Sequence, residues 1–154
     1  MKLARYLSVD TVEARLESAD RRGVLEELAA LVGRTGGVPP DTDLVTILEN
    51  REDLGSTGIG DGVAIPHVRL KNLREPRMAV GRSVEGVDFH AIDGQRVHIF
   101  FLLLAPENST GEHLKALARI SRLIKKSPFR EALLKARSSE EMLKAIVTED
   151  EQED

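Results

Sequence analysis

The sequence predicts a single α/β domain in which a mixed β-sheet is flanked by helices on both faces, giving three layers. The run from Val97 to Ala105 is β-rich and almost unbroken in its apolar character, which is typical of a central strand covered on both faces. Segments with the 3.6-residue period of amphipathic helices lie both before and after the predicted strands. The length of 154 residues suits one domain with its own core.

The N-terminal part is predicted to form one strand and two helices. Apolar and charged residues alternate from Val12 to Leu16, the period-two pattern of a half-exposed strand. Asp20 is expected to cap a helix over 21–33, whose apolar residues recur at helical spacing and which two glycines follow. Pro39-Pro40-Asp41 is expected to open a second helix from Thr42 to Asp53.

Three further strands are predicted in the middle of the chain. A short apolar run predicts a strand from Val63 to Pro66. A second strand is expected from Met78 to Val84, bounded by a proline and a glycine. The turn signal Asp93-Gly94 separates it from the central strand, Val97 to Ala105.

The last third is predicted to be helical. Ser109 and Ser138 are each followed three residues later by glutamate, the spacing of a capping box. Ser127-Pro128 predicts a further helix with serine as the cap and proline in the first turn. The acidic end, from Thr148, is expected to fray, so we take residues 1–148 as the domain and residues 149–154 as an acidic tail.

The composition excludes several classes of function. The chain has no cysteine, which rules out disulfides, thiolate catalysis and cysteine-based zinc sites. A net charge of −4 and an aromatic content of 3% argue against nucleic-acid binding. The longest apolar run is too short to span a bilayer, and no secretion signal is recognisable, so membrane insertion is not expected and a cytoplasmic location is.

The most informative segment is Gly55-Ser56-Thr57-Gly58-Ile59-Gly60-Asp61-Gly62-Val63-Ala64-Ile65-Pro66-His67. Four glycines in eight residues exceed what a simple turn needs, and they allow backbone N–H groups to approach an anion. The segment lacks the Lys-Ser/Thr of a Walker A loop, and neither a preceding strand nor a following helix supports a dinucleotide fingerprint. The expected phosphate-binding residues are Ser56, Thr57, Gly58, Gly60 and Gly62.

Three residues are candidates for the chemistry itself. His67 follows the predicted strand, where a neutral imidazole is a competent nucleophile, although a lone histidine is more often structural. Arg51 is either a cation favoured at a helix C-terminus or a guanidinium directed at phosphate, and its closeness to the loop favours the second interpretation. His113 is either a partly buried structural histidine or a second imidazole at a helix N-terminus. His90 and His98 are expected to be structural or solvent-facing, and no histidine spacing predicts a metal site.

Arg51-Glu52 and the segment from Gly55 to His67 together resemble the active-site signature of fructose/mannitol-type enzyme IIA domains of the bacterial phosphoenolpyruvate-dependent sugar phosphotransferase system, a group that includes the nitrogen-regulatory enzyme IIA proteins. A second block, Leu103-Leu104-Ala105-Pro106-Glu107-Asn108-Ser109 through Glu112-His113-Leu114, agrees, and the resemblance runs from about Leu7 to Val147.

The resemblance implies the enzyme IIA fold and a cytoplasmic phosphocarrier. Because donor and acceptor would both be phosphoramidates, the transfer is expected to need no cofactor or metal. The resemblance also implies that His67 accepts a phosphoryl group from a phosphohistidine of an HPr-type protein, with Arg51 and His113 beside it. Two positions depart from the family pattern: Val68 stands where many relatives have glycine, and Asp61 replaces a common asparagine.

Two uses of the phosphoryl group and one alternative function remain open. The phosphoryl group is either passed to a IIB domain or used as a regulatory switch toward a target protein. We see no permease or IIB segment, which favours a regulator slightly. The alternative from a different class is a non-phosphorylated module on the same fold that senses a small anion through the glycine-rich segment.

Overall fold

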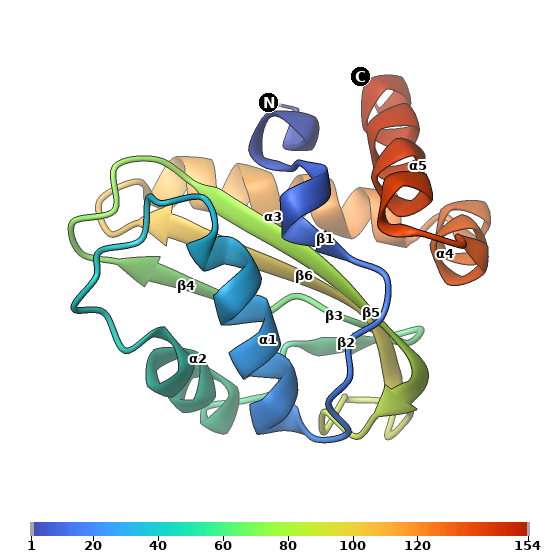
Figure 1. Ribbon diagram of the computed structural model, residues 1–154, viewed down its shortest axis with the longest axis horizontal. Coiled ribbons are helices and arrows are strands. Elements are labelled where there is room, and N and C mark those ends of the chain that lie inside the picture. Colours follow the sequence, from blue (N-terminus) through green and yellow to red (C-terminus); the bar gives the residue numbers. More distant parts are fainter. Residues whose placement is uncertain (1, 154) are drawn as a thin grey trace.

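The computed structural model describes residues 2–153, which form one mixed six-stranded sheet with helices on both sides (Figure 1). Its helices are the 3-10 helices η1 (Leu3–Tyr6) and η2 (Val9–Thr11) and the α-helices α1 (Arg21–Gly33), α2 (Leu44–Asp53), α3 (Thr110–Ile124), α4 (Ser127–Lys135) and α5 (Ser139–Gln152). Its strands are β1 (Val12–Glu13), β2 (Gly58–Gly60), β3 (Val63–Ala64), β4 (His67–Leu70), β5 (Arg77–Val87) and β6 (Val97–Pro106). Within the described residues, no helix is long and apolar enough to cross a membrane.

Strand β6 lies at the centre of the sheet. The order along the sheet is β1-β5-β6-β3-β2, and β4 also pairs with β6. β5 runs antiparallel to β6, whereas β3 and β4 run parallel to it, so the sheet is mixed as predicted. Val63 pairs with Ile99 and His67 with Leu103, so β3 and β4 follow one another along the same side of β6.

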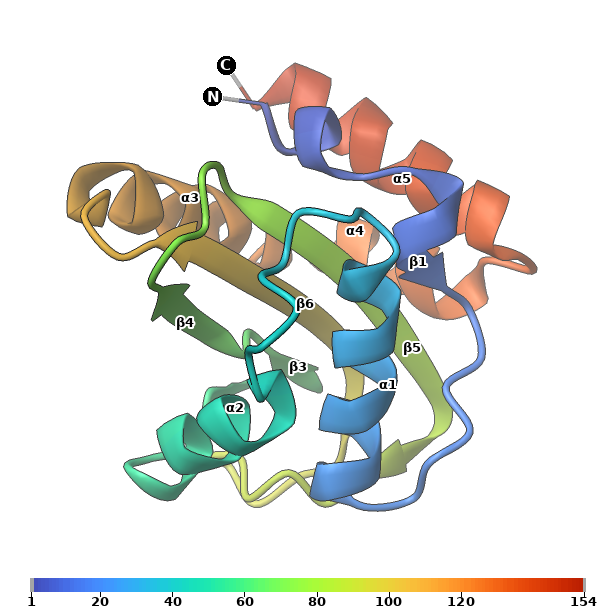
Figure 2. The ribbon, with the colours of Figure 1, turned by 60° about the vertical axis from the view of Figure 1, so that its left-hand side comes forward.

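The side chains of β6 divide the core into two halves. Ile99, Phe101 and Leu103 pack in one cluster with apolar residues of α3, α4 and α5. The residues between them pack in a second cluster with α1 and α2. Figure 2 shows these two groups of helices on opposite faces of the sheet. The predicted three-layer α/β architecture, with a central strand covered on both faces, is therefore confirmed.

The first two helices are close to their predicted positions. α1 has the predicted bounds, and the Asp20 carboxylate accepts a hydrogen bond from the Gly23 N–H at 2.7 Å. α2 begins two residues later than predicted, because Asp43 is the cap, accepting from the Thr46 N–H at 3.3 Å.

The predicted strand from Val63 to Pro66 is interrupted in the structure. β3 ends at Ala64 and β4 begins at His67. Pro66 has no N–H to give to a ladder, but its carbonyl accepts a hydrogen bond from the Leu103 N–H at 2.9 Å, so the chain rejoins β6 at once. His67 therefore begins a strand instead of following one.

The serine caps predicted for the last three helices have different outcomes. The Ser138 hydroxyl accepts from the Glu141 N–H at 3.1 Å, as predicted. The Ser109 hydroxyl instead donates to the Pro106 carbonyl at 2.9 Å, so the capping prediction there is wrong. At α4 the cap position belongs to Lys126, and Ser127 is already helical.

The expectation that the chain frays from Thr148 is wrong for the described residues. α5 continues through Gln152, and Asp150 is completely buried. The Asp150 carboxylate accepts hydrogen bonds from the Ala4 N–H at 3.0 Å and from Arg119 Nε at 2.6 Å. These partners come from distant segments of the chain, which is why the acidic composition alone could not indicate order.

Candidate functional site

The structure brings two of the predicted residues, His67 and His113, into contact. His67 begins β4, and its side chain faces α3, whose first turn carries His113. The centroids of the two imidazole rings lie 5.4 Å apart, with the ring planes at 51°. His113 is 8% exposed, while His67 is half-buried and can be reached from solvent.

The tautomer of His67 follows from its one internal hydrogen bond. Its Nδ1 lies 2.6 Å from the carbonyl oxygen of Ile65, which can only accept, so Nδ1 carries the proton. Burial lowers the pKa of His67, and the charge of Arg51 lowers it further, against the Ile65 hydrogen bond, which raises it. The ring is thus held neutral near pH 7, with the lone pair on Nε2.

His113 is also held neutral. Burial lowers its pKa most, followed by the neighbouring His67 and then by the charge of Arg69. Its backbone N–H donates to the Ser109 carbonyl at 3.0 Å, as the first turn of α3 requires. Its buried Nδ1 has no hydrogen-bond partner among the described residues. A buried ring nitrogen without a partner is uncommon and suits a site that receives another group.

Arg51 approaches the site from the last turn of α2. Its Nη1 donates to the Gly55 carbonyl at 2.8 Å, and its charge acts on His67. An open hollow beside β4 is lined by Arg51 together with Leu54, Val68 and Arg69, among others. Arg51 therefore closes the end of its helix, and its positive charge acts on His67, while its role toward a phosphate stays a prediction.

Arg69 is a site residue that the sequence analysis missed. It lies two residues after His67 in β4, so both side chains point to the same face of the sheet. Its Nη1 donates to the Thr110 hydroxyl at 2.7 Å, and its charge lowers the pKa of His113. The signal in the sequence was the alternation of polar and apolar residues from His67 to Leu70, which was overlooked because the strand was predicted to end at Pro66.

The glycine-rich segment differs from the expected anion-binding loop. The Thr57 N–H donates to Glu52 Oε1 at 2.9 Å, and the Gly58 N–H donates to the Ser56 hydroxyl at 3.0 Å. These two N–H groups are therefore not free for an anion. Gly58 also lies so close to Ala91 that an added Cβ would fall 2.8 Å from the Ala91 Cβ, so the glycine is needed for packing.

Gly60 and Gly62 form the turn of the β2–β3 hairpin. Gly60, Asp61 and Gly62 have φ angles of 99°, 58° and 76°, a left-handed backbone that favours glycine and tolerates aspartate. The Gly62 carbonyl accepts hydrogen bonds from the N–H groups of His98 and Ile99 at 2.8 and 3.0 Å. This turn therefore attaches the hairpin to the start of β6.

Glu52 holds the glycine-rich segment to α2. Its side chain is almost completely buried, and its carboxylate accepts from both the N–H and the hydroxyl of Thr57, at 2.9 and 2.6 Å. Burial raises the pKa of Glu52, against the two Thr57 hydrogen bonds, which lower it. Glu52 follows Arg51 directly in α2. Glu52 therefore holds the loop at the same helix end from which Arg51 extends its guanidinium.

The other singled-out residues lie outside the histidine pair. Val68 is buried on the opposite face of β4 and belongs to the core with α1 and α2. His98 Nδ1 donates to the Ser83 carbonyl at 3.0 Å, so its predicted structural role is confirmed. His90 is exposed, as predicted. Within residues 2–153, no group of three or more acidic or histidine side chains could hold a metal ion.

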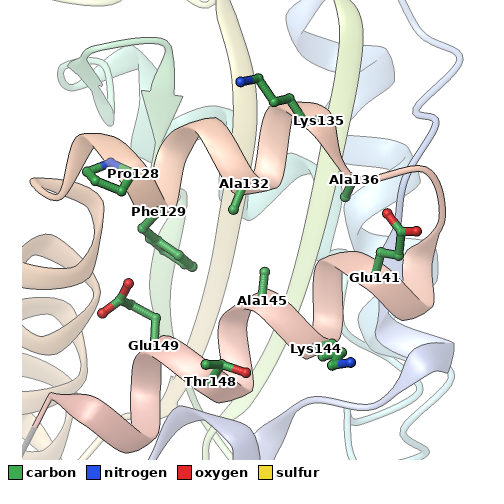
Figure 3. A pocket seen from close by; sticks show the side chains of 10 residues that line it. All are labelled: Pro128, Phe129, Ala132, Lys135, Ala136, Glu141, Lys144, Ala145, Thr148 and Glu149. Carbon is green, nitrogen blue, oxygen red and sulfur yellow. The ribbon is translucent and has the colours of Figure 1, made fainter.

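A second hollow lies between α4 and α5 (Figure 3). Its apolar wall includes Phe129, Ala132 and Ala145, with Lys144 and Glu149 among its charged residues. No predicted site residue lines it, so it does not belong to the histidine site.

Comparisons with known proteins show the family of the chain. The family model of the phosphoenolpyruvate-dependent sugar phosphotransferase system, EIIA 2, matches residues 5–149. A nitrogen regulatory protein of Pseudomonas aeruginosa is 37% identical over 150 residues, which cover 96% of each chain. The crystal structure of nitrogen regulatory protein IIA-Ntr from Neisseria meningitidis superposes with a TM-score of 0.87 at 35% identity, covering 94% of this chain and 98% of that one.

Another relative is a longer protein. The fructose-specific EIIABC component of Bacillus subtilis is 34% identical over 146 residues, which are 95% of this chain and 23% of that protein. The chain thus spans about a quarter of the length of this relative. With the family model matching nearly the whole chain, the conclusion is that this protein belongs to the EIIA 2 family of the phosphoenolpyruvate-dependent sugar phosphotransferase system, whose members have phosphocarrier or regulatory roles.

Proposed function

We propose that His67 is the residue of this phosphotransferase-system component that carries the phosphoryl group, and that a phosphohistidine of an HPr-type protein delivers it. The observation that carries the proposal is the 2.6 Å contact of His67 Nδ1 with the Ile65 carbonyl, which leaves the Nε2 lone pair as the nucleophile. The lowered pKa of His67 supports it, because the neutral ring is the reactive form.

The proposed step exchanges one phosphorus–nitrogen bond for another. The Nε2 lone pair of His67 attacks phosphorus while the bond to the donor histidine breaks. The donor ring, protonated on its other nitrogen, leaves as neutral imidazole, and His67 becomes a phosphorylated imidazolium whose Nδ1 proton stays hydrogen-bonded to Ile65. No proton has to move and no metal is required. The transfer is nearly thermoneutral because the two bonds are of the same kind.

The transferred group carries negative charge on its outer oxygens, which needs fixed positive charge nearby. Arg51 and Arg69 supply that charge from two sides of β4, and the buried His113 ring lies next to the nucleophile. The five loop residues predicted to bind phosphate (Ser56, Thr57, Gly58, Gly60 and Gly62) receive a positioning role in this proposal, because the loop packs against Glu52 and the start of β6.

Two fates of the phosphoryl group remain within the proposal, transfer to a IIB domain or control of a regulatory target. A relative named as a fructose-specific component and one named as a nitrogen regulatory protein match the chain at similar identity. Phosphorylation adds about two negative charges between Arg51 and Arg69, a change large enough to alter a protein interface. The cytoplasm is the proposed location, since the donor protein would act there.

Mass spectrometry tests the proposal. After incubation with phosphoenolpyruvate, enzyme I and HPr, the wild-type chain should gain one phosphoryl group and His67→Gln should gain none. His90→Asn is the control and should react like wild type, because His90 is exposed and has a left-handed backbone that asparagine tolerates. A wild-type chain that gains no phosphoryl group, yet binds inorganic phosphate equally well after His67→Gln, would support the anion-sensing alternative.

A further inference from the structure

Strand β4 and the first turn of α3 face each other through two pairs of side chains. His67 and Arg69 lie two residues apart in β4, so both point to the same face of the sheet. Thr110 and His113 lie three residues apart in α3 and share one side of that helix. The ring centroids of the two histidines are 5.4 Å apart. Beside them, Arg69 Nη1 donates to the Thr110 hydroxyl at 2.7 Å, so this contact is the neighbour of the histidine pair.

The Thr110 hydroxyl is not needed to hold α3 in place. The helix begins at Thr110 without a side-chain cap, and the preceding Ser109 hydroxyl donates to the Pro106 carbonyl at 2.9 Å. Thr110 is exposed, and among the described residues its hydroxyl has Arg69 as its hydrogen-bond partner. Removal of this hydroxyl should therefore release Arg69 and leave the helix intact.

Arg69 is held in place without losing its positive charge. Its hydrogen-bond partner within residues 2–153 is a neutral hydroxyl, and it forms no ion pair with a carboxylate there. Its charge instead reaches His113, whose pKa it lowers. A guanidinium has five N–H groups, of which this contact uses one. The other N–H groups and the uncompensated charge remain for an anion.

The position of Arg69 is open to such an anion. Arg69 and Arg51 line the same hollow beside β4. A long exposed side chain normally samples many rotamers, and ordering it during the reaction would cost conformational entropy. A hydrogen bond that orders Arg69 before the reaction removes part of that cost.

We propose that Thr110 is a positioning residue for phosphoryl transfer: its hydroxyl holds Arg69 beside the histidine pair, so that the guanidinium meets the oxygens of the phosphoryl group that arrives on His67. The proposal rests on the proposed function of His67. Thr110 touches neither the phosphorus nor the attacking nitrogen, and it acts through Arg69 alone.

The first test removes the hydroxyl at nearly constant side-chain size. Thr110→Val should lower the rate constant for phosphorylation of His67 about fivefold, because one hydrogen bond to a charged group is lost. Thr110→Ser keeps a hydroxyl and should restore most of the rate. Thr148→Val is the matched control, because Thr148 is an exposed threonine on α5, and it should react like wild type. Mass spectrometry at timed intervals follows the reaction.

Two phosphoryl donors separate positioning from protein docking. One is the phosphorylated HPr-type protein, and the other is potassium phosphoramidate, a small donor that needs no protein contact. We expect Thr110→Val to slow both reactions by the same factor, with the KM for the donor protein unchanged. A loss confined to the protein donor would make Thr110 a docking contact and would overturn the proposal.

The decisive readout is a double-mutant cycle. Arg69→Met keeps the aliphatic stem but removes the charge and the N–H groups, and it should slow both reactions about 10-fold. In that background Thr110→Val should have no further effect, whereas a general effect on α3 would persist and multiply the loss. Full additivity of the two variants, or a wild-type rate in Thr110→Val, overturns the positioning role alone. If neither donor labels wild-type His67, the proposed function itself fails, and the role of Thr110 fails with it.

Discussion

The imidazole rings of His67 and His113 lie 5.4 Å apart, and burial lowers the pKa of each. The pair is therefore uncharged near neutral pH, while the permanent positive charge beside it belongs to Arg51 and Arg69. This division has a chemical consequence. The guanidinium groups can attract a phosphoryl group without adding a proton to the nitrogen that must attack it.

The coupling between the histidines can be measured by titration. Proximity to His67 is the second-largest cause of the lowered pKa of His113. We expect His67→Gln to raise the pKa of His113, because a neutral amide does not oppose protonation of its neighbour. The His113 signals followed by NMR from pH 5 to 8 in wild type and in the variant give the answer. An unchanged His113 pKa would contradict the coupling.

Arg51→Lys is expected to separate charge from geometry. Lysine keeps the positive charge but loses the planar fork that can bond Gly55 and a phosphoryl oxygen together. The rate of phosphorylation should fall by about 10- to 100-fold, while the free energy of unfolding changes by less than about 1 kcal/mol. Quenched-flow labelling and urea unfolding measure the two quantities. A lysine variant with the full rate would show that charge alone suffices.

The sequence predicted the parts of the site that follow from local pattern. α1 and the central β6 were predicted correctly because capping and apolar periodicity are local. His67, Arg51 and His113 were singled out by residue type and position in the chain, and the resemblance to a known signature then supported them. Arg69 was missed because Pro66 interrupts the strand without ending it: its carbonyl still bonds β6. That hydrogen bond depends on tertiary structure.

The glycine-rich segment shows the same limit. Its glycines suggested free N–H groups, but Glu52 and Ser56 occupy those of Thr57 and Gly58. Which donors a loop leaves free depends on which side chains reach it in the folded chain. The fold could be predicted from the pattern of apolar and capping residues. The hydrogen bonds that decide which N–H groups of the loop stay free could not.

The Glu52–Thr57 contact is expected to matter for both stability and rate. Glu52→Ala leaves the buried Thr57 N–H without an acceptor and should lower the free energy of unfolding by about 2–3 kcal/mol. Glu52→Gln is the matched control: its amide oxygen can accept that N–H, and the Thr57 hydroxyl can turn to accept. The maximal rate of phosphorylation should fall in Glu52→Ala, while the KM for the phosphoryl donor should stay nearly unchanged. Equal stability of both variants would contradict the role assigned to Glu52.

Asp150 offers a test of the C-terminal segment. Its carboxylate is completely buried and holds both Arg119 Nε and the Ala4 N–H, so it joins α5 to α3 and η1. Asp150→Asn removes the buried carboxylate charge that pairs with Arg119 Nε at 2.6 Å and should lower the free energy of unfolding by about 3 kcal/mol. The neighbouring, exposed Glu151→Gln should change it by less than about 0.5 kcal/mol. Urea unfolding followed by circular dichroism compares them. If Asp150→Asn has the same free energy of unfolding as wild type, residues 149–154 would be the dispensable tail that their composition suggests. A loss of the expected size would show that the cooperatively folded unit extends past residue 148.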